Sequence, residues 1–198
     1  MLHLLRYQPS LRDFIENIER YKPGGFHPVS IGDAFANGRY QVLHKLGFGG
    51  SSTVWLARDS TSKTLVALKV LSADKSAKPK DEIPELSISL KLDALIASDA
   101  HNPACDSIQT IKDSFIVEGP NGTHLCLVSQ LAGPSVFAMS EFCGGRNEGS
   151  QRLRSDLARK VAKQVAAVME LMHSAGLVHG GNVRIVFMIT PLLKFIQI

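Results

Sequence analysis

Residues 46–55 read Leu-Gly-Phe-Gly-Gly-Ser-Ser-Thr-Val-Trp, and residues 66–69 read Val-Ala-Leu-Lys. In the first stretch Gly47 and Gly49 lie between strand-forming segments, and glycine lets backbone N–H groups come close to phosphates. In the second stretch Lys69 stands in an apolar strand, where a lysine is costly unless it is paired or bound to an anion. The two stretches together predict a nucleotide-phosphate site built from a hairpin and the next strand.

Each stretch has a simpler interpretation when it is taken alone. The first could be an ordinary glycine-rich hairpin, and Lys69 could be an edge-strand lysine that reaches solvent. Two other phosphate-binding folds are disfavoured. A dinucleotide fold needs a helix after the glycines, whereas residues 53–56 are strand formers, and a Walker loop needs a Gly-Lys-Ser/Thr sequence that the chain lacks.

A carboxylate partner for the lysine is also present. Glu85 follows Lys69 by 16 residues and stands near the start of a segment with helical spacing of apolar residues. We expect Glu85 to pair with Lys69 and hold its ammonium in place. Glu82 is the alternative partner.

The apolar patterning predicts an α+β fold with a five-stranded antiparallel sheet, one main helix, and the start of a helical region. A Gly-Pro-Asn-Gly turn at 119–122 predicts a hairpin between the last two strands. The expected strands are 40–46, 53–57, 65–71, 108–117 and 124–131, and the expected helices are 85–96 and 153–174, the second ending at Gly176.

Composition excludes several classes of protein. The chain has 198 residues, 44% of them hydrophobic and 20% charged, as in ordinary globular proteins. Its three cysteines form no CxxC pair, which argues against a zinc cage or a disulfide scaffold. The net charge of +4 is scattered, so nucleic acid is not an expected partner. No apolar run reaches the roughly 18 residues of a membrane span, and no signal peptide is visible, so we expect an intracellular protein of the cytoplasm, the nucleus or both, with no membrane partner.

These motifs resemble the N-terminal lobe of eukaryotic protein kinases, with a glycine-rich loop, a lysine strand, a helix glutamate and two strands that end in a hinge. Residues 21–29 and 119–128 are similar to the SR-protein-kinase family, especially its fungal members. The resemblance covers residues 16–180. It implies an ATP:protein phosphotransferase that acts on serine or threonine, with arginine/serine-rich proteins as substrates and ATP and Mg²⁺ as cofactors.

The resemblance also implies roles for individual residues. Lys69 and Glu85 would form the catalytic ion pair. Leu46 and Val54 would sandwich the adenine above Ala67, Ser129 would be the gatekeeper, and Gln130 to Ala132 would form the hinge. The implied ATP-binding residues are Leu46, Gly47, Phe48, Gly49, Gly50, Ser51, Ser52, Thr53, Val54, Ala67, Lys69, Ser129, Gln130 and Ala132.

The sequence departs from the family pattern after His179. Gly181 stands where the family has its catalytic aspartate, residues 182–198 contain no aspartate, and Asn182 is at the wrong offset to bind metal. The Mg²⁺ ligands are therefore expected to be absent from this chain. We expect a C-terminally truncated kinase that is inactive alone.

The resemblance also suggests a division of the chain. It predicts an N-terminal extension at 1–39, an ATP-binding lobe at 40–132, a partial second lobe at 133–184, and an atypical apolar tail at 185–198. Two alternatives stay open. The chain could be a non-catalytic pseudokinase that binds nucleotide or a partner, or a fragment that does not fold stably.

Overall fold

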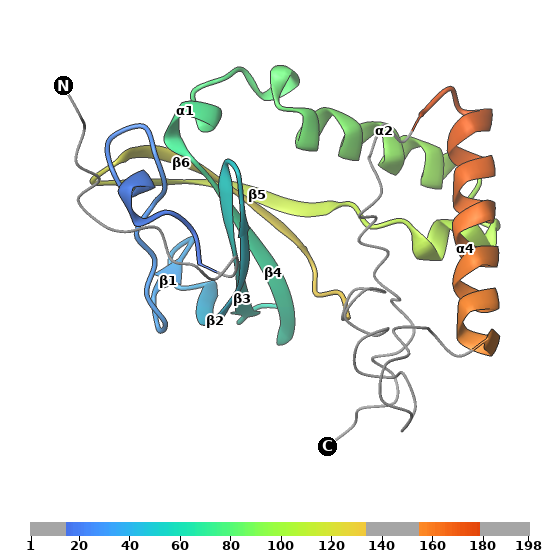
Figure 1. The fold of residues 1–198 in the computed structure, drawn as a ribbon, viewed down its shortest axis with the longest axis horizontal. Coiled ribbons are helices and arrows are strands. Elements are labelled where there is room, and N and C mark those ends of the chain that lie inside the picture. The colour runs from blue at the N-terminus through green and yellow to red at the C-terminus, as the bar shows by residue number, and fades with distance from the viewer. Residues whose placement is uncertain (1–14, 134–154, 179–198) are drawn as a thin grey trace. The chain divides into compact units, whose positions relative to one another are not determined.

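The computed structural model describes residues 15–133 and 155–178. Its central element is an antiparallel sheet of six strands in the order β1-β2-β3-β4-β6-β5 (Figure 1). The strands are β1 Ala34–Phe35, β2 Tyr40–Gly49, β3 Ser52–Asp59, β4 Thr64–Leu71, β5 Ile111–Gly119 and β6 Gly122–Gln130. The α-helices are α1 Ala73–Ser76, α2 Pro84–Ser98 and α4 Ser155–Ser174, and the 3₁₀ helices are Ile18–Arg20, Lys80–Glu82 and Pro103–Ser107.

All five expected strands are present, and the sheet has one more. The additional strand, β1, is two residues long and pairs with the start of β2. A turn with positive φ at Ala36, Asn37 and Gly38 reverses the chain between them. A pair of residues is too short to show an alternating pattern, so the sequence gives no strand signal there.

The fifth expected strand starts later than its apolar pattern suggests. The Asn102 side chain accepts a hydrogen bond from the Ala104 N–H, and Pro103 occupies the first turn of a 3₁₀ helix that ends at Ser107. Residues 108–110 only connect this helix to β5, which begins at Ile111. The cap and the proline therefore take precedence over the β-branched residues that follow.

One face of the sheet is the main hydrophobic core. Side chains alternate between the faces of a strand, so every second residue of β3 and β4 points to this side. Ten buried residues form the cluster, and three half-buried ones pack against it. The ten are Phe35, Tyr40, Val42, Trp55, Ala57, Val66, Leu68, Val70, Cys126 and Val128; the three are Val29, Phe115 and Val117.

Part of this core comes from the turn-rich segment before the first predicted strand. Phe26 and His27 are buried, and Val29 packs against the core cluster. Gly32 and Asp33 exchange backbone hydrogen bonds with Val42 at 2.8–2.9 Å. The described part of the expected N-terminal extension is thus bound to the sheet and contributes to its core.

The chain divides into two compact units, residues 1–90 with 110–131 and residues 91–109 with 132–198. In the second unit Ala104, Cys105, Val168 and Leu171 form a small buried cluster. Its helix α4 stops at Ser174, and Gly176 follows with φ of +70°, as the sequence predicts. Among the described helices, none is both long and apolar enough to cross a membrane.

Candidate nucleotide-binding site

The second face of the sheet is only partly covered. Val54 lies opposite Lys69 in the β3–β4 ladder, and Ala67 lies opposite both Leu56 and Ser129. Cross-strand partners leave the sheet on the same side, so these five residues share one face. All five side chains are half-buried, in contrast to the fully buried opposite face.

The start of α2 covers one end of this face. Leu71, Ile83, Leu125 and Leu127 form a buried cluster there, and Leu86 and Ile111 pack against it. The Ser89 hydroxyl also accepts a hydrogen bond from the Ile111 N–H at 2.8 Å, which ties α2 to β5. Lys69 therefore lies between a closed apolar end and an open end that contains Ala67 and Ser129.

Lys69 and Glu85 form an ion pair across this boundary. The Lys69 Nζ donates to the Glu85 Oε1 at 3.0 Å, and the two side chains are 35% and 36% exposed. Partial burial opposes ionisation of Glu85, but the hydrogen bond and charge of Lys69 outweigh it, so the pKa of Glu85 lies below its ordinary value. The expected pairing with Glu85 is thus present, and the alternative residue Glu82 takes no part in it.

The glycine-rich segment forms the hairpin between β2 and β3. Gly47 lies opposite Val54, and Gly49 lies opposite Ser52, with residues 50 and 51 in the turn. Neither Gly47 nor Gly50 has a positive φ, and a Cβ added to either would meet nothing within 4 Å. The fold itself does not require glycine at these two positions, which is the pattern expected where a ligand approaches the backbone.

The expected ATP-binding residues divide by orientation. Leu46 and Phe48 are exposed on β2, whereas Ser52 and Thr53 are buried. The Thr53 hydroxyl accepts a hydrogen bond from the indole N–H of Trp55 at 3.0 Å, so its side chain serves the core. Any contact that Thr53 makes with a nucleotide would come from its backbone.

The expected hinge begins at the end of β6. The last two residues of β6 are Ser129, opposite Ala67, and Gln130, opposite Val66. Ala132 follows after the strand. Ser129 and Ala132 are half-buried. The gatekeeper and hinge roles stay predictions. The residues expected at the catalytic loop, 179–182, and the apolar tail lie outside the described residues.

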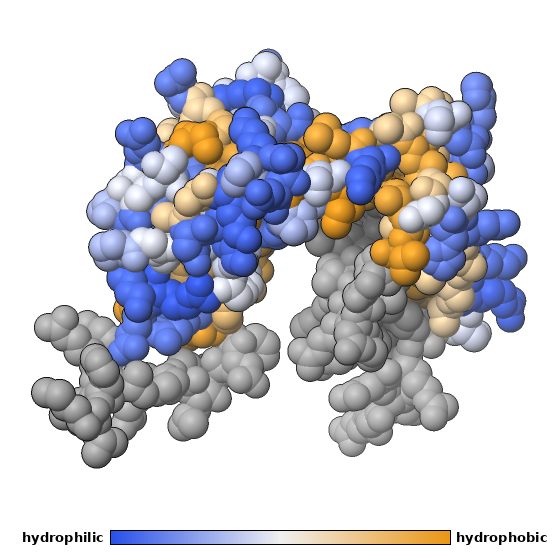
Figure 2. Space-filling view, turned by 90° about the horizontal axis from the view of Figure 1, so that it is seen from above, coloured by the Kyte–Doolittle hydropathy of each residue, from blue (hydrophilic) through white to orange (hydrophobic). Residues whose placement is uncertain are grey.

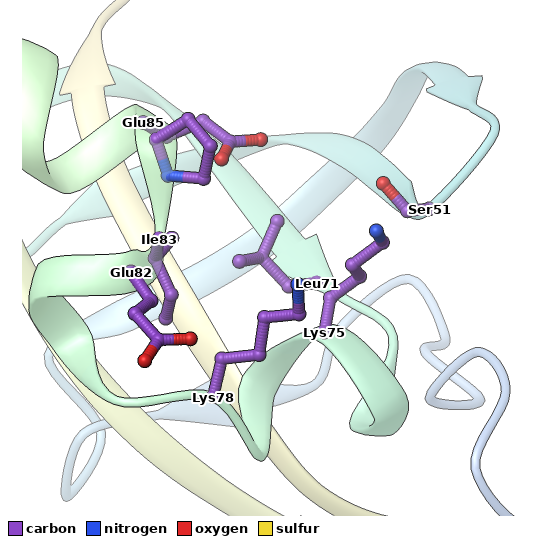
Figure 3. Close-up of a pocket in the computed structure, with 8 residues that line it drawn as sticks. Ser51, Leu71, Lys75, Lys78, Glu82, Ile83 and Glu85 are labelled. Atoms are coloured by element: carbon purple, nitrogen blue, oxygen red, sulfur yellow. The ribbon is translucent and has the colours of Figure 1, made fainter.

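A pocket of about 280 Å³ lies at the Leu71 end of β4. Figure 3 shows Ser51 of the glycine turn on one side of this pocket and Glu82, Ile83 and Glu85 on the other. It contains only two of the expected site residues, Ser51 and Glu85, and it lies away from Ala67 and Ser129. The pocket therefore adjoins the ion pair and is distinct from the expected adenine position.

Charged side chains are plentiful around the connection between β4 and α2. Figure 2 looks onto the side where α1 and the start of α2 lie in Figure 1, and hydrophilic side chains (blue) predominate there.

No group of three histidine, cysteine or acidic side chains in residues 15–133 and 155–178 is arranged to hold a metal ion.

An antiparallel sheet with a glycine-rich hairpin, a lysine strand and a helix glutamate is the N-terminal lobe of a protein kinase, as the sequence predicts. Comparisons with curated proteins identify the family. Serine/threonine-protein kinase spk-1 of Caenorhabditis elegans is 36% identical over 165 residues, which is 83% of this chain and 16% of that protein.

Two further relatives agree. Protein kinase dsk1 of Schizosaccharomyces pombe is 33% identical over 83% of this chain and 29% of its own length. Human SRSF protein kinase 3 is 44% identical over 62% of this chain and 21% of its own length. No family model matches the chain.

Over most of its length the chain is therefore a homologue of the SR-protein-kinase family of serine/threonine kinases, which confirms the resemblance of its motifs. It spans between 16% and 29% of the length of these three relatives.

The structure adds a residue to the site that the motifs do not mark. Arg20, in the segment before the first expected strand, donates from its Nη1 to the carbonyl of Gly50 in the glycine turn. The two residues are 30 apart in sequence, and the segment that carries Arg20 has no regular periodicity. No sequence signal could have linked them.

Proposed function

We propose that this chain binds ATP on the open face of its sheet, as the nucleotide-binding part of a serine/threonine protein kinase of the SR-protein-kinase type. In this proposal Val54 and Ala67 contact the adenine, Lys69 binds the phosphates, and the backbone of the glycine hairpin covers them. Gln130 would offer backbone groups to the adenine edge.

One observation carries the proposal. Lys69 and Glu85 form an accessible ion pair beside a hairpin whose Gly47 and Gly50 the fold does not require. A partly accessible pair of this kind contributes about 1 kcal/mol or less to stability, so its placement is better explained by a ligand than by folding. Positioning of phosphates by a lysine and backbone N–H groups is how kinases prepare phosphoryl transfer.

The proposed reaction of the family is transfer of the γ-phosphoryl group of ATP to a serine or threonine hydroxyl of an arginine/serine-rich protein. Mg²⁺ neutralises phosphate charge in such reactions. The described residues provide no cluster of side chains that fits a metal ion. We also propose that the protein acts inside the cell.

A second candidate is a non-catalytic nucleotide-binding or interaction module. It is favoured by Gly181, which stands at the family's catalytic aspartate position and cannot accept the proton of a substrate hydroxyl. On this basis we expect the chain alone to bind ATP and to transfer no phosphate above background.

Thermal unfolding in the presence of ATP tests the first part. Binding to the folded state alone stabilises by about 2.7 kcal/mol at a hundredfold excess over Kd, which gives a clear rise in Tm. The Lys69→Ala variant should lose this rise. The proposal fails if millimolar ATP leaves the Tm of the wild-type chain unchanged.

A phosphotransfer assay with an arginine/serine peptide tests the second part. Background activity together with ATP binding would favour the non-catalytic module for this chain. Transfer well above background, abolished by Lys69→Ala, would show that another group replaces the aspartate.

A further inference from the structure

Residues 16–27, the N-terminal brace, contact the glycine hairpin at two points. At the turn, the Arg20 guanidinium donates to the Gly50 carbonyl. On β2, the Lys45 ammonium donates to the Glu16 carboxylate. Both contacts join the brace to the hairpin that is proposed to cover the phosphates.

The position of Arg20 is fixed by its own surroundings. Its guanidinium carbon lies 4.5 Å from the ring centre of Phe26, which is 1% exposed. The Phe26 N–H donates to the Arg20 carbonyl at 2.8 Å, and this turn depends on Gly25, because a Cβ there would lie 1.9 Å from the Arg20 carbonyl oxygen. The guanidinium is therefore placed by packing and does not sample the surface freely.

The brace is anchored at its other end. The Ala73 and Asp74 N–H groups donate to the carbonyls of Gly25 and Gly24 at 3.0 and 2.9 Å. The Asn121 side chain, from the turn between β5 and β6, donates to the Phe26 carbonyl at 2.6 Å. These bonds tie the brace to the start of α1, which directly follows β4, and to the turn between β5 and β6.

Glu16 is held in the same way. It accepts a hydrogen bond from the Tyr21 hydroxyl at 2.6 Å as well as the one from Lys45. Partial burial opposes its ionisation, but these hydrogen bonds outweigh burial and lower the pKa of Glu16. The charge that faces Lys45 is therefore maintained at neutral pH.

The contacts at the turn fix the orientation of its peptide groups. The Gly50 carbonyl faces Arg20, and the Ser51 carbonyl accepts from the Ser72 N–H at 2.9 Å. In a planar trans peptide the N–H points opposite to the carbonyl. The Ser51 N–H, which shares its peptide with the Gly50 carbonyl, therefore points away from the brace.

Building on the proposed ATP binding, we infer that Arg20 is a positioning residue for the glycine turn, which it orients so that the turn's N–H groups can bind the phosphates of ATP. Without this contact the Ser51 carbonyl would still be held by the Ser72 N–H, but the Gly50 peptide would lose the hydrogen bond that orients it. The effect should be on phosphate binding and not on the adenine.

The test uses the full chain with three variants: Arg20→Ala, the conservative Arg20→Lys, and Lys22→Ala as a matched loss of a cation from the same segment. Hydrogen–deuterium exchange of residues 50–53 is measured without nucleotide, with the β5–β6 hairpin as an internal reference. Affinities for ATP and for adenosine are then measured by titration calorimetry.

Arg20→Ala should speed exchange in residues 50–53 while leaving the β5–β6 hairpin unchanged. It should weaken ATP by about tenfold, the loss of one charge-assisted hydrogen bond, with the affinity for adenosine retained. Arg20→Lys should restore part of the ATP affinity, and Lys22→Ala should match the wild type.

If hydrogen exchange at the turn is unchanged in Arg20→Ala, Arg20 does not hold the turn. If the affinities for ATP and adenosine fall equally, Arg20 has a general structural role and does not position the turn for the phosphates. If the wild-type protein binds neither ATP nor adenosine, the proposed function is wrong, and the role of Arg20 in phosphate binding is wrong with it. The exchange measurement is made without nucleotide, so it would still decide whether Arg20 holds the turn.

Discussion

Lys69 and Glu85 lie 3.0 Å apart while about a third of each side chain remains accessible. One comes from the middle of β4 and the other from the first turn of α2, so the pair fixes a strand and a helix at the border of the open face. Solvent screens an ion pair this accessible, and its value to stability is small. Its removal should therefore affect ligand binding far more than folding.

We predict that Glu85→Gln weakens ATP binding and changes the free energy of unfolding by less than about 1 kcal/mol. The neutral amide can still accept from Lys69 but no longer holds its ammonium by charge. Calorimetric titration with ATP and urea unfolding measure the two effects. Glu82→Gln is the matched control. If both variants bind ATP equally well, the Lys69–Glu85 ion pair does not contribute to ATP binding.

Substitution by alanine should affect ATP binding at one glycine, Gly47, and stability at another, Gly119. A Cβ at Gly47 meets open space, so Gly47→Ala should leave stability within about 0.5 kcal/mol of wild type and weaken ATP binding. A Cβ at Gly119 would lie 2.4 Å from the His27 ring, so Gly119→Ala should destabilise by about 1–3 kcal/mol. Urea unfolding measures the stability of both variants, and ATP titration measures their affinity. The prediction is wrong if Gly47→Ala is less stable than Gly119→Ala.

His27 makes the sheet unit sensitive to mild acid. Burial and the neighbouring His124, whose ring centre is 4.8 Å away, lower the pKa of His27 below its ordinary 6.5, and Asp33 opposes them only in part. The unfolded chain then binds more protons than the folded one as pH falls below 6.5. Stability is therefore complete above this pH and declines below it.

We predict that the Tm falls between pH 7 and pH 5.5, and that His27→Gln reduces this fall because it removes the titrating group. One extra proton on the unfolded chain corresponds to a slope of at most about 1.4 kcal/mol per pH unit. Thermal scans across this range provide the measurement. An identical slope in wild type and variant would assign the acid sensitivity to other groups.

The sequence was a good guide wherever a regular pattern or a charge requirement acted locally. The runs of apolar, strand-forming residues in β3 and β4 predicted both strands, and the cost of burying a lysine predicted that Lys69 would have a partner. The helical spacing after Pro84 placed Glu85 in the first turn of α2, where it reaches Lys69. Each inference needed only neighbours along the chain.

The sequence was a poor guide where irregular backbone carries the contact. The brace has no periodicity, and its positions follow from backbone bonds such as the one from the Gly24 N–H to the Asn121 carbonyl, 97 residues later. Strand β1 was missed because its two residues are too few to show a pattern. Such contacts depend on the finished sheet, so a local pattern cannot show them.

A charge network at the start of β2 supports the last prediction. Arg39 donates to both carboxylate oxygens of Asp59 at 3.0–3.1 Å and to Asp113 at 2.8 Å. The Asp59 side chain is 6% exposed. The hydrogen bonds from Arg39 outweigh burial and, with the Thr61 N–H, hold the pKa of Asp59 well below its ordinary value of 3.8.

We predict that Arg39→Ala lowers stability at pH 7, because it leaves the Asp59 carboxylate buried with only part of its hydrogen bonds. A carboxylate with a depressed pKa contributes stability above its ordinary pKa and loses it as pH falls further, so the deficit should shrink below pH 3.8. Arg39→Lys should be intermediate, since an ammonium cannot reproduce the two-pronged contact. Urea unfolding at neutral and acidic pH measures this loss of stability, and Arg58→Ala, at an exposed arginine, is the control. A loss of stability that does not depend on pH would come from the stacking of Arg39 on Tyr40 and not from the charge of Arg39.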